Sequence, residues 1–221
     1  MSHYEDHVRK IIDIQLTGKH SITGKLIDYG LDIIVVYDGE QYLYIPTVHI
    51  EHFKNASKTD VDFDKQTGIP ITNEDEKISL RKVLTNAKGV FIELFVTGRL
   101  SLHGYVTNIL NNYFTFYSPI YKTMFISLEH VKWLTPYKHV QTPYSLSSHE
   151  FPLHPSNIPL SRTLEEQLKK WEGHLVVFDL GQTPHHIGLL RKVENSLIEL
   201  ITARNETVHL NQKHIKTIHL P

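Results

Sequence analysis

The stretch YIPTVHIEHF, from Tyr44 to Phe53, sets the expectation for the whole fold because two later stretches repeat its pattern. MFISLEHVKWL runs from Met124 to Leu134, and VHLNQKHIKTI runs from Val208 to Ile218. Each stretch has an apolar, strand-like entry, a short interruption, a histidine, a β-branched residue and a further apolar residue. A local pattern that returns roughly every eighty residues indicates an internal structural repeat.

Glycines support the same alignment. Each histidine follows a pair of glycines, found in LTGKHSITG, VTGRLSLHG and LGQTPHHIG. The second glycine precedes the histidine by 25, 26 and 26 residues, from Gly24 to His49, from Gly104 to His130 and from Gly188 to His214. Three nearly equal spacings predict three copies of one unit, marked by these six residues.

Each unit has the pattern of a small β structure. Short runs rich in Ile, Val, Tyr and Phe alternate with Gly, Asn and Asp turns, which is typical of strands joined by hairpins. Five such runs in about forty residues predict a small five-stranded barrel. A short α-helix is expected before each barrel, in SHYEDHVRKII, TNEDEKISLRKVLTNAKG and SRTLEEQLKKWEG. In the third of these, Thr163 and Glu166 form a capping-box pattern.

The fold class is therefore mostly β, with three repeated five-stranded barrels. We expect a first barrel over residues 1–55 and a polar linker over 56–75. A helix and second barrel follow over 76–135, then a linker rich in Pro, Ser and His over 136–161. A helix and third barrel are expected over 162–221. Such a Pro-rich linker favours an extended chain without a core of its own.

The unit resembles the Sm-like fold, a member of the wider group of SH3-like barrels, and most closely the Hfq-type RNA chaperones. The resemblance lies in IQLTGKHSITGKLIDYGLDIIVV, where a strand ending in glycine leads to a second strand with an early glycine. It implies an Sm-like barrel for each repeat. It also implies assembly in which an edge strand of one barrel pairs with an edge strand of the next.

The same family suggests a site for RNA. Its closing lysine-histidine pair contacts RNA, and this chain has the dipeptide at Lys213 and His214. The corresponding pairs are Val48-His49 and Glu129-His130 in the other repeats, which depart from the family pattern. RNA is therefore the alternative partner, with Lys213 and His214 as its candidate binding residues.

The segment IPTVHI also resembles an IP-x-x-HI ending found in small Bacillus proteins, some of them associated with the spore coat. The chain contains 16 His and 11 Tyr, a composition that suits such proteins. Its N-terminus, MSHYEDHVRK, lacks the apolar core of a signal peptide. We expect synthesis in the cytoplasm, no membrane segment, and a place in the spore coat.

Several classes of chemistry have no support in the sequence. The chain has no cysteine and a formal net charge of −1, so it lacks thiolate sites and the basic excess usual in nucleic-acid binders. No phosphate loop, dinucleotide fingerprint, nucleophile elbow or zinc-protease motif is present. We expect no enzyme activity, no catalytic residues, no cofactor and no dedicated metal site. The three repeated histidines are interpreted as structural, each closing the turn before a fifth strand.

The leading expectation is a non-enzymatic scaffold that binds protein partners through strand edges, with an RNA-binding Sm-like protein as the alternative. Because the last strand ends close to Pro221, it is expected to be an uncovered edge. Such an edge favours a homo-oligomer, with a dimer as the expected form.

Overall fold

The computed structural model describes residues 4–57, 63, 77–96, 101–137, 144 and 158–221. Most of the two predicted linkers lies outside these residues. The chain divides into two compact units, one of Met1–Gly104 with Val131–Ser148 and one of Tyr105–His130 with His149–Pro221. The division passes through the second predicted repeat, so each unit contains one terminal repeat and part of the middle repeat.

The first unit begins with a 3-10 turn, η1 (Glu5–His7), and continues through five strands and a second 3-10 turn. These are β1 (Ile11–Leu16), β2 (His20–Tyr29), β3 (Ile33–Tyr37), β4 (Tyr42–Pro46), η2 (Thr47–His49) and β5 (Ile50–Asn55). It also contains α1 (Leu80–Asn86), β6 (Phe91–Val96) and β10 (Val131–Pro136).

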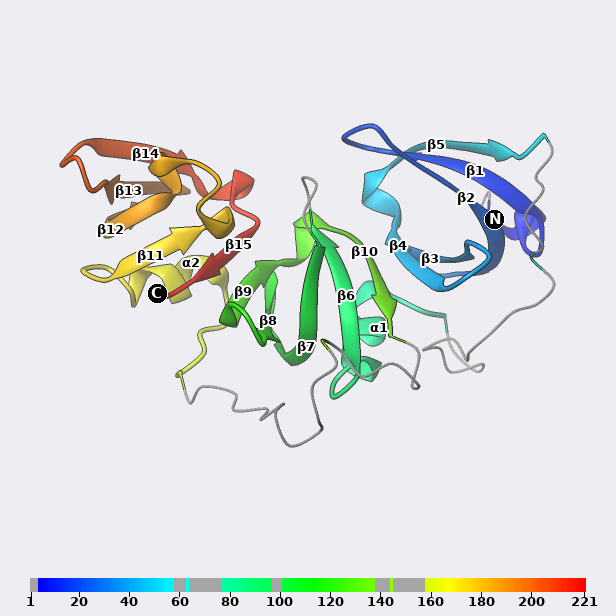
Figure 1. Ribbon diagram of the computed structural model, residues 1–221, viewed down its shortest axis with the longest axis horizontal. Coiled ribbons are helices and arrows are strands. Elements are labelled where there is room, and N and C mark those ends of the chain that lie inside the picture. The colour runs from blue at the N-terminus through cyan, green and yellow to red at the C-terminus, as the bar shows by residue number, and fades with distance from the viewer. Residues whose placement is uncertain (1–3, 58–62, 64–76, 97–100, 138–143, 145–157) are drawn as a thin grey trace. The chain divides into compact units, whose positions relative to one another are not determined.

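Strands of the first repeat lie in the order β5-β1-β2-β3-β4, and every pair is antiparallel. The fifth strand therefore returns beside the first, as the ribbon in Figure 1 shows. Ile12, Ile14 and Leu16 alternate with polar residues along β1 and point into the core, because successive side chains of a strand face opposite sides.

Gly24 allows this sheet to fold back on itself. A Cβ atom at Gly24 would lie 2.4 Å from Cγ1 of Val36 and 2.6 Å from the carbonyl oxygen of Tyr37. Gly188 has the same constraint, with 2.3 Å to the carbonyl oxygen of Ile201. Both repeats therefore need a residue without a side chain where the second strand bends over the third.

The second unit contains β8 (Tyr113–Ser118), β9 (Lys122–Ser127), η3 (Leu128–His130) and part of β7 (Ser101–Ile109). The third repeat follows with α2 (Leu164–Lys169), β11 (Leu175–Phe178), η5 (Asp179–Gly181), η6 (Pro184–His186), β12 (Ile187–Glu194), β13 (Leu197–Ile201), β14 (Thr207–Asn211), η7 (Gln212–His214) and β15 (Thr217–His219).

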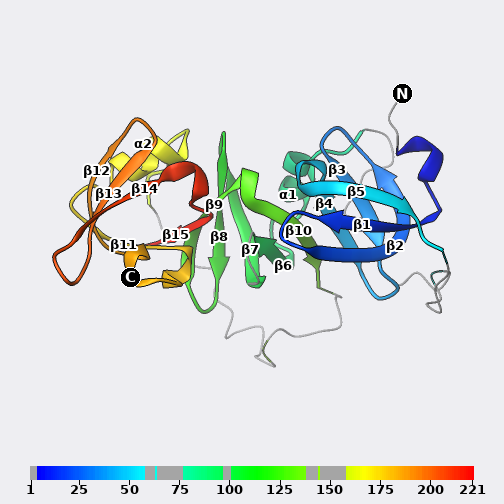
Figure 2. The same ribbon diagram turned by 90° about the horizontal axis from the view of Figure 1, so that it is seen from above.

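The third repeat has the strand order of the first. Its strands lie in the order β15-β11-β12-β13-β14, again with antiparallel pairs. Helix α2 contacts β12, which can be followed in Figure 2. Thr163 caps the helix, and the reciprocal hydrogen bonds between Thr163 and Glu166 form the predicted capping box.

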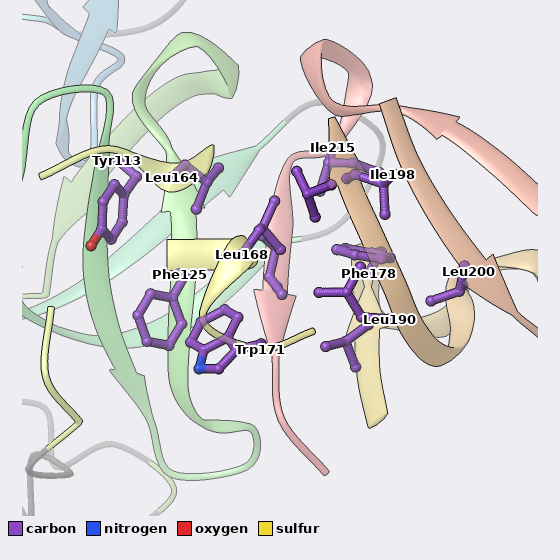
Figure 3. Packing of buried hydrophobic residues seen from close by; sticks show 13 residues of the cluster. Tyr113, Phe125, Leu164, Leu168, Trp171, Phe178, Leu190, Ile198, Leu200 and Ile215 are labelled. Atoms are coloured by element: carbon purple, nitrogen blue, oxygen red, sulfur yellow. The ribbon is translucent and has the colours of Figure 1, made fainter. Parts of the chain in front are cut away.

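The core of the second unit combines side chains from the second and third repeats (Figure 3). Leu164, Leu168 and Trp171, from α2 and the turn after it, join the buried rings of Tyr113 and Phe125. The rings of Phe125 and Trp171 meet edge to face, with centroids 4.5 Å apart. The helix before the third repeat thus covers strands of the second repeat.

The prediction of a mostly β chain is confirmed, its paired strands are antiparallel, and short α-helices precede β6 and β11. The α-helix expected before the first repeat is wrong within the described residues, where only the three-residue η1 forms. Arg9 then has a φ of 68°, which ends the turn before β1. No helix among the described residues is both long and apolar enough to cross a bilayer.

The expectation that the last strand is an uncovered edge is also wrong. β15 lies between two strands, with β11 on one side and β9 on the other. In the described part of the chain, β14 instead pairs with β13 alone, and β5 pairs with β1 alone. The free edges therefore belong to β5 and β14, which the position of the C-terminus did not indicate.

Candidate functional site: the junctions between repeats

Successive repeats are joined through main-chain pairing of the same two strand types. In the first unit, β4, the fourth strand of its repeat, pairs with β10, and Tyr44 faces Leu134. In the second unit, β9 pairs with β15, where Phe125 faces Ile218 and Met124 faces His219. Both junctions join a fourth strand to the next repeat's fifth strand, so the chain uses one mode of association twice.

A second contact repeats at both junctions. The Asp32 carboxylate accepts a hydrogen bond from the backbone N–H of Leu80 at 2.8 Å, and Asn112 Oδ1 accepts one from the N–H of Leu164 at 2.9 Å. Leu80 and Leu164 are the first residues of α1 and α2. The turn after each second strand therefore satisfies an N–H at the start of the following helix, where the helix itself offers no acceptor.

The neighbouring backbone groups reinforce this contact. The N–H of Leu31 donates to the carbonyl of Ile78 at 2.9 Å, and the N–H of Asn111 donates to the carbonyl of Arg162 at 3.1 Å. Each turn thus holds the incoming chain through one backbone bond and one side-chain bond. This pairing positions the helix over the strands that it covers.

A buried lysine strengthens the first junction. Lys132, on β10, is 3% exposed, and its ammonium group donates to the backbone carbonyl and the hydroxyl of Thr17. Burial lowers the pKa of Lys132, whereas the nearby Glu51 carboxylate raises it. Thr17 Oγ1 lies 3.4 Å from Nδ1 of His49. This network links β10 to the first repeat through polar groups.

The three repeated histidines occupy different surroundings. His49 is 8% exposed and contacts Thr17, whose backbone N–H also donates to the carbonyl of His49 at 2.9 Å. His130 Nε2 donates to the carbonyl of Lys213 at 2.8 Å. His214 is exposed, and its side chain forms no hydrogen bond with the other described residues. A shared sequence position thus has three different sets of contacts.

Lys213 borders a polar pocket of about 260 Å³ in the second unit. Other residues around this pocket include Asn112, Glu129, Ser196 and Gln212. Its lining contains two acidic side chains, Glu129 and Glu165, beside the single lysine, so it is not a basic surface. His214, the second candidate RNA-binding residue, is not among the residues that border the pocket.

The described ranges contain no group of three or more His, Cys, Asp or Glu side chains that could hold a metal ion. His186 Nδ1 lies 4.0 Å from a carboxylate oxygen of Asp179, and Lys216 Nζ lies 3.4 Å from the same oxygen. Asp179 also accepts hydrogen bonds from the backbone N–H groups of Lys216 and Thr217. This buried carboxylate holds η5 against β15.

Sequence reasoning missed Asp32, Asn112 and Lys132. Asp32 and Asn112 each lie directly before a third strand, at positions that read only as turn residues. Asp and Asn are good helix caps, but a cap supplied from a distant turn gives no local pattern. Lys132 alternates with apolar residues in HVKWL, and a lysine in such a strand is usually solvent-exposed.

The third repeat exposes the positions that the first two bury. Ile33 and Tyr113 begin their third strands and are fully buried, whereas Leu197 begins β13 and is 48% exposed. Tyr44 and Phe125 are buried on the fourth strands, whereas His209 on β14 is exposed. In the described residues no further helix covers this face, and its side chains are correspondingly more polar.

Comparison with known proteins gives two matches. The chain is 46% identical over 214 residues to the uncharacterized protein YwrJ of Bacillus subtilis (strain 168), with 95% of each chain covered. A family model described as the YwrJ third domain matches residues 163–218. The matched range contains α2, the strands from β11 to β14 and the first two residues of β15.

Proposed function

The chain belongs to the YwrJ family, and we propose that it is a non-enzymatic assembly protein that joins protein partners through strand edges. The observation that carries this proposal is the pairing of a fourth strand with the next repeat's fifth strand at both junctions, β4 with β10 and β9 with β15. Backbone pairing of this kind extends a sheet without requiring a particular side chain.

We also propose that each repeat is an Sm-like barrel. Two repeats support this through the same strand order, with the fifth strand beside the first and the fourth at the opposite edge. Gly24 and Gly188 further support it, since each permits the close approach of the second and third strands. The middle repeat contributes the corresponding pairs β6–β10 and β8–β9.

The proposed partner is a second copy of the chain. β14 offers a fourth-strand edge and β5 offers a fifth-strand edge, which are the two types that pair inside the chain. Because the two edges differ, the expected association is head to tail, which can continue beyond a dimer. The dimer expected from the sequence is the smallest product of this association.

The backbone of His209 provides a direct test. The Gln212 N–H donates to the carbonyl of Ser196, and the Thr202 N–H donates to the carbonyl of Glu206. Hydrogen-bonded and non-hydrogen-bonded pairs alternate along an antiparallel ladder, so the pair of Glu199 and His209 is not hydrogen-bonded. The N–H of His209 therefore points away from β13. His209→Pro removes a donor from the free edge without removing a bond to β13. His209→Ala is the matched control, since it changes the same side chain and keeps the N–H.

Light scattering across a range of protein concentrations gives the answer. We expect wild type and His209→Ala to increase in mass with concentration and His209→Pro to remain smaller. A wild-type protein that stays monomeric up to millimolar concentration would exclude self-association. Equal association of all three proteins would exclude β14 as the edge that is used.

The proposed setting is the spore coat. Support comes from the His-rich and Tyr-rich composition and from the relative in Bacillus subtilis. A fluorescent fusion imaged through sporulation tests this setting. Signal that remains dispersed in the mother cell after the spore has formed would contradict it.

RNA binding is the second candidate because Lys213 borders a polar pocket. The neighbouring Glu129 and Glu165 oppose a phosphate backbone, which makes this the weaker proposal. Fluorescence anisotropy with a labelled oligouridylate at several salt concentrations tests it. Salt-dependent binding that Lys213→Gln weakens would favour RNA over a protein partner.

A further inference from the structure

We propose that the outward face of β6 and β10, together with the first residues of β7, binds an extended, neutral polysaccharide. This proposal rests on the side chains of one sheet face in the first unit and does not depend on the strand-edge function. The edges of β5 and β14 do not include any of these side chains.

One end of the face has a stacked pair of aromatic rings. Phe95 on β6 faces Trp133 on β10, and their rings are parallel within 5°, with centroids 4.0 Å apart. His20 contacts both rings edge on, at 5.2 Å and 5.7 Å. Phe95 and Trp133 are both partly exposed, and Trp133 also packs against the core of the first repeat. Such rings can pack against the apolar C–H face of a sugar while its hydroxyl groups remain in contact with polar neighbours.

Polar groups that can bond to hydroxyls lie on the same face. The Tyr137 hydroxyl is 2.8 Å from Nδ1 of His103, and the Ser101 hydroxyl is 3.3 Å from Nε2. Burial raises the pKa of Tyr137, and the Glu93 carboxylate raises it further, which places Glu93 close to this group. The cluster contains a carboxylate, an imidazole and two hydroxyls, all partly exposed.

More rings surround the polar cluster. Phe91 meets Tyr137 edge to face at 5.1 Å, and Tyr144, which is 48% exposed, meets both Phe91 and His103. Phe91 and Phe95 are four residues apart on one strand, a separation of roughly 13 Å at the rise of an extended chain. Two ring groups with a hydrogen-bonding cluster between them fit a long ligand better than a single sugar.

Charge decides against a nucleic acid. The side chains on this face of β6 and β10 are Phe91, Glu93, Phe95, Trp133 and Thr135. Phe91 and Thr135 are buried, Glu93, Phe95 and Trp133 are partly exposed, and the single formal charge is negative. A carboxylate repels phosphate groups but accepts hydrogen bonds from hydroxyls. Stacking surfaces for single-stranded nucleic acids normally carry cationic side chains along the backbone path. A neutral, hydroxyl-rich chain satisfies both the rings and Glu93.

The combination of aromatic rings and a carboxylate on this face is found in the second repeat. At the positions of Glu93 and Phe95, the first repeat has Asp13 and Gln15, which bond to Thr23 and Ser21 of its own sheet. The third repeat has Val177 at the position of Glu93, and it faces Ile187. The three repeats therefore carry different side chains at these positions, and the aromatic pair occurs in the second.

Native gel electrophoresis of the full chain through soluble polysaccharides tests the proposal. Hydroxyethylcellulose and glycol chitin serve as extended, neutral, β-linked probes, and polyuridylate serves as the anionic probe. We expect at least one β-linked polymer to retard the wild-type protein and polyuridylate to have no effect. Failure of both β-linked polymers, or retardation by polyuridylate alone, overturns the proposal.

Variants locate the binding face. Phe95→Ala and His103→Ala should each reduce the retardation several-fold. Gln15→Ala is the matched control, because Gln15 occupies the position of Phe95 in the first repeat, and it should behave as wild type. Thermal melts identify any variant that does not fold. If Phe95→Ala unfolds, His103→Ala still tests the proposal, because His103 is partly exposed and its substitution removes less buried surface. Equal retardation of all folded variants places binding elsewhere and overturns the assignment.

Discussion

The Asp32 carboxylate accepts a hydrogen bond at 2.8 Å from the backbone N–H of Leu80, 48 residues further along the chain. Asn112 and Leu164 repeat the contact at 2.9 Å, 52 residues apart. These bonds connect the turn of one repeat to the helix of the next. They explain why each compact unit includes parts of two repeats.

Removing these hydrogen bonds should weaken each unit. We expect Asp32→Ala and Asn112→Ala each to reduce the free energy of unfolding by about 0.5–2 kcal/mol, the range for losing a side-chain acceptor at a helix N-terminus. Urea denaturation provides the measurement. Ser196→Ala is the matched control, since Ser196 holds the same turn position and its side chain forms no hydrogen bond within the described part of the chain. Losses of similar size in all three variants would show that turn propensity, and not capping, is responsible.

Lys132 and Thr17 should be energetically coupled. Lys132→Met keeps an unbranched apolar stem but leaves the Thr17 carbonyl without its ammonium donor, so a loss of about 1–3 kcal/mol is expected. Thr17→Val should have a smaller effect in the Lys132→Met background than in wild type. A double-mutant cycle from urea titrations measures this coupling. Additive effects would show that the two residues act independently.

The three repeated histidines should differ in their contributions. His49→Ala removes a buried side chain and its contact with Thr17, so a loss of about 1–2 kcal/mol is expected. His130→Ala should cost less because its bond to Lys213 lies at the solvent-exposed surface. His214→Ala should have almost no effect, since that residue is exposed. Thermal melts of the three variants rank them, and equal losses would contradict the ranking.

Tyr113 should ionise at unusually high pH. Burial raises its pKa to about 12, and this effect outweighs the lowering by its hydrogen bond to Ser161, while Glu166 adds a smaller rise. The neutral phenol is therefore the form that the fold favours. Its contribution to stability is complete below pH 10, the ordinary pKa of a tyrosine side chain, and decreases as the pH rises toward about 12.

The Tyr113→Phe variant distinguishes the ionisation of Tyr113 from the ionisation of the other tyrosines. An ultraviolet titration of phenolate formation should lose its last phase in the variant. The stability difference between wild type and variant should shrink between pH 10 and about 12. A variant titration identical to that of wild type would show that Tyr113 ionises with the exposed tyrosines.

The sequence determined the mostly β class and the helix capped by Thr163, because each depends on neighbours along the chain. Alternating apolar residues indicate a strand with one buried face, and glycine marks a position where the backbone approaches a neighbouring strand closely. Both signals are local in the sequence. The positions of Gly24 and Gly188 were visible for the same reason, since a close approach of adjacent strands requires a residue without a side chain.

Only the tertiary structure decided how the repeats join and which strands remain free. The pairing of β9 with β15 buries the last strand, although nothing in its own residues separates it from an edge strand. Asp32 and Lys132 acquire their partners from segments 48 and 115 residues away, so no local pattern marks them. Backbone hydrogen bonds are available to every residue, and their choice of partner is therefore fixed by packing between repeats and not by the sequence of either strand alone.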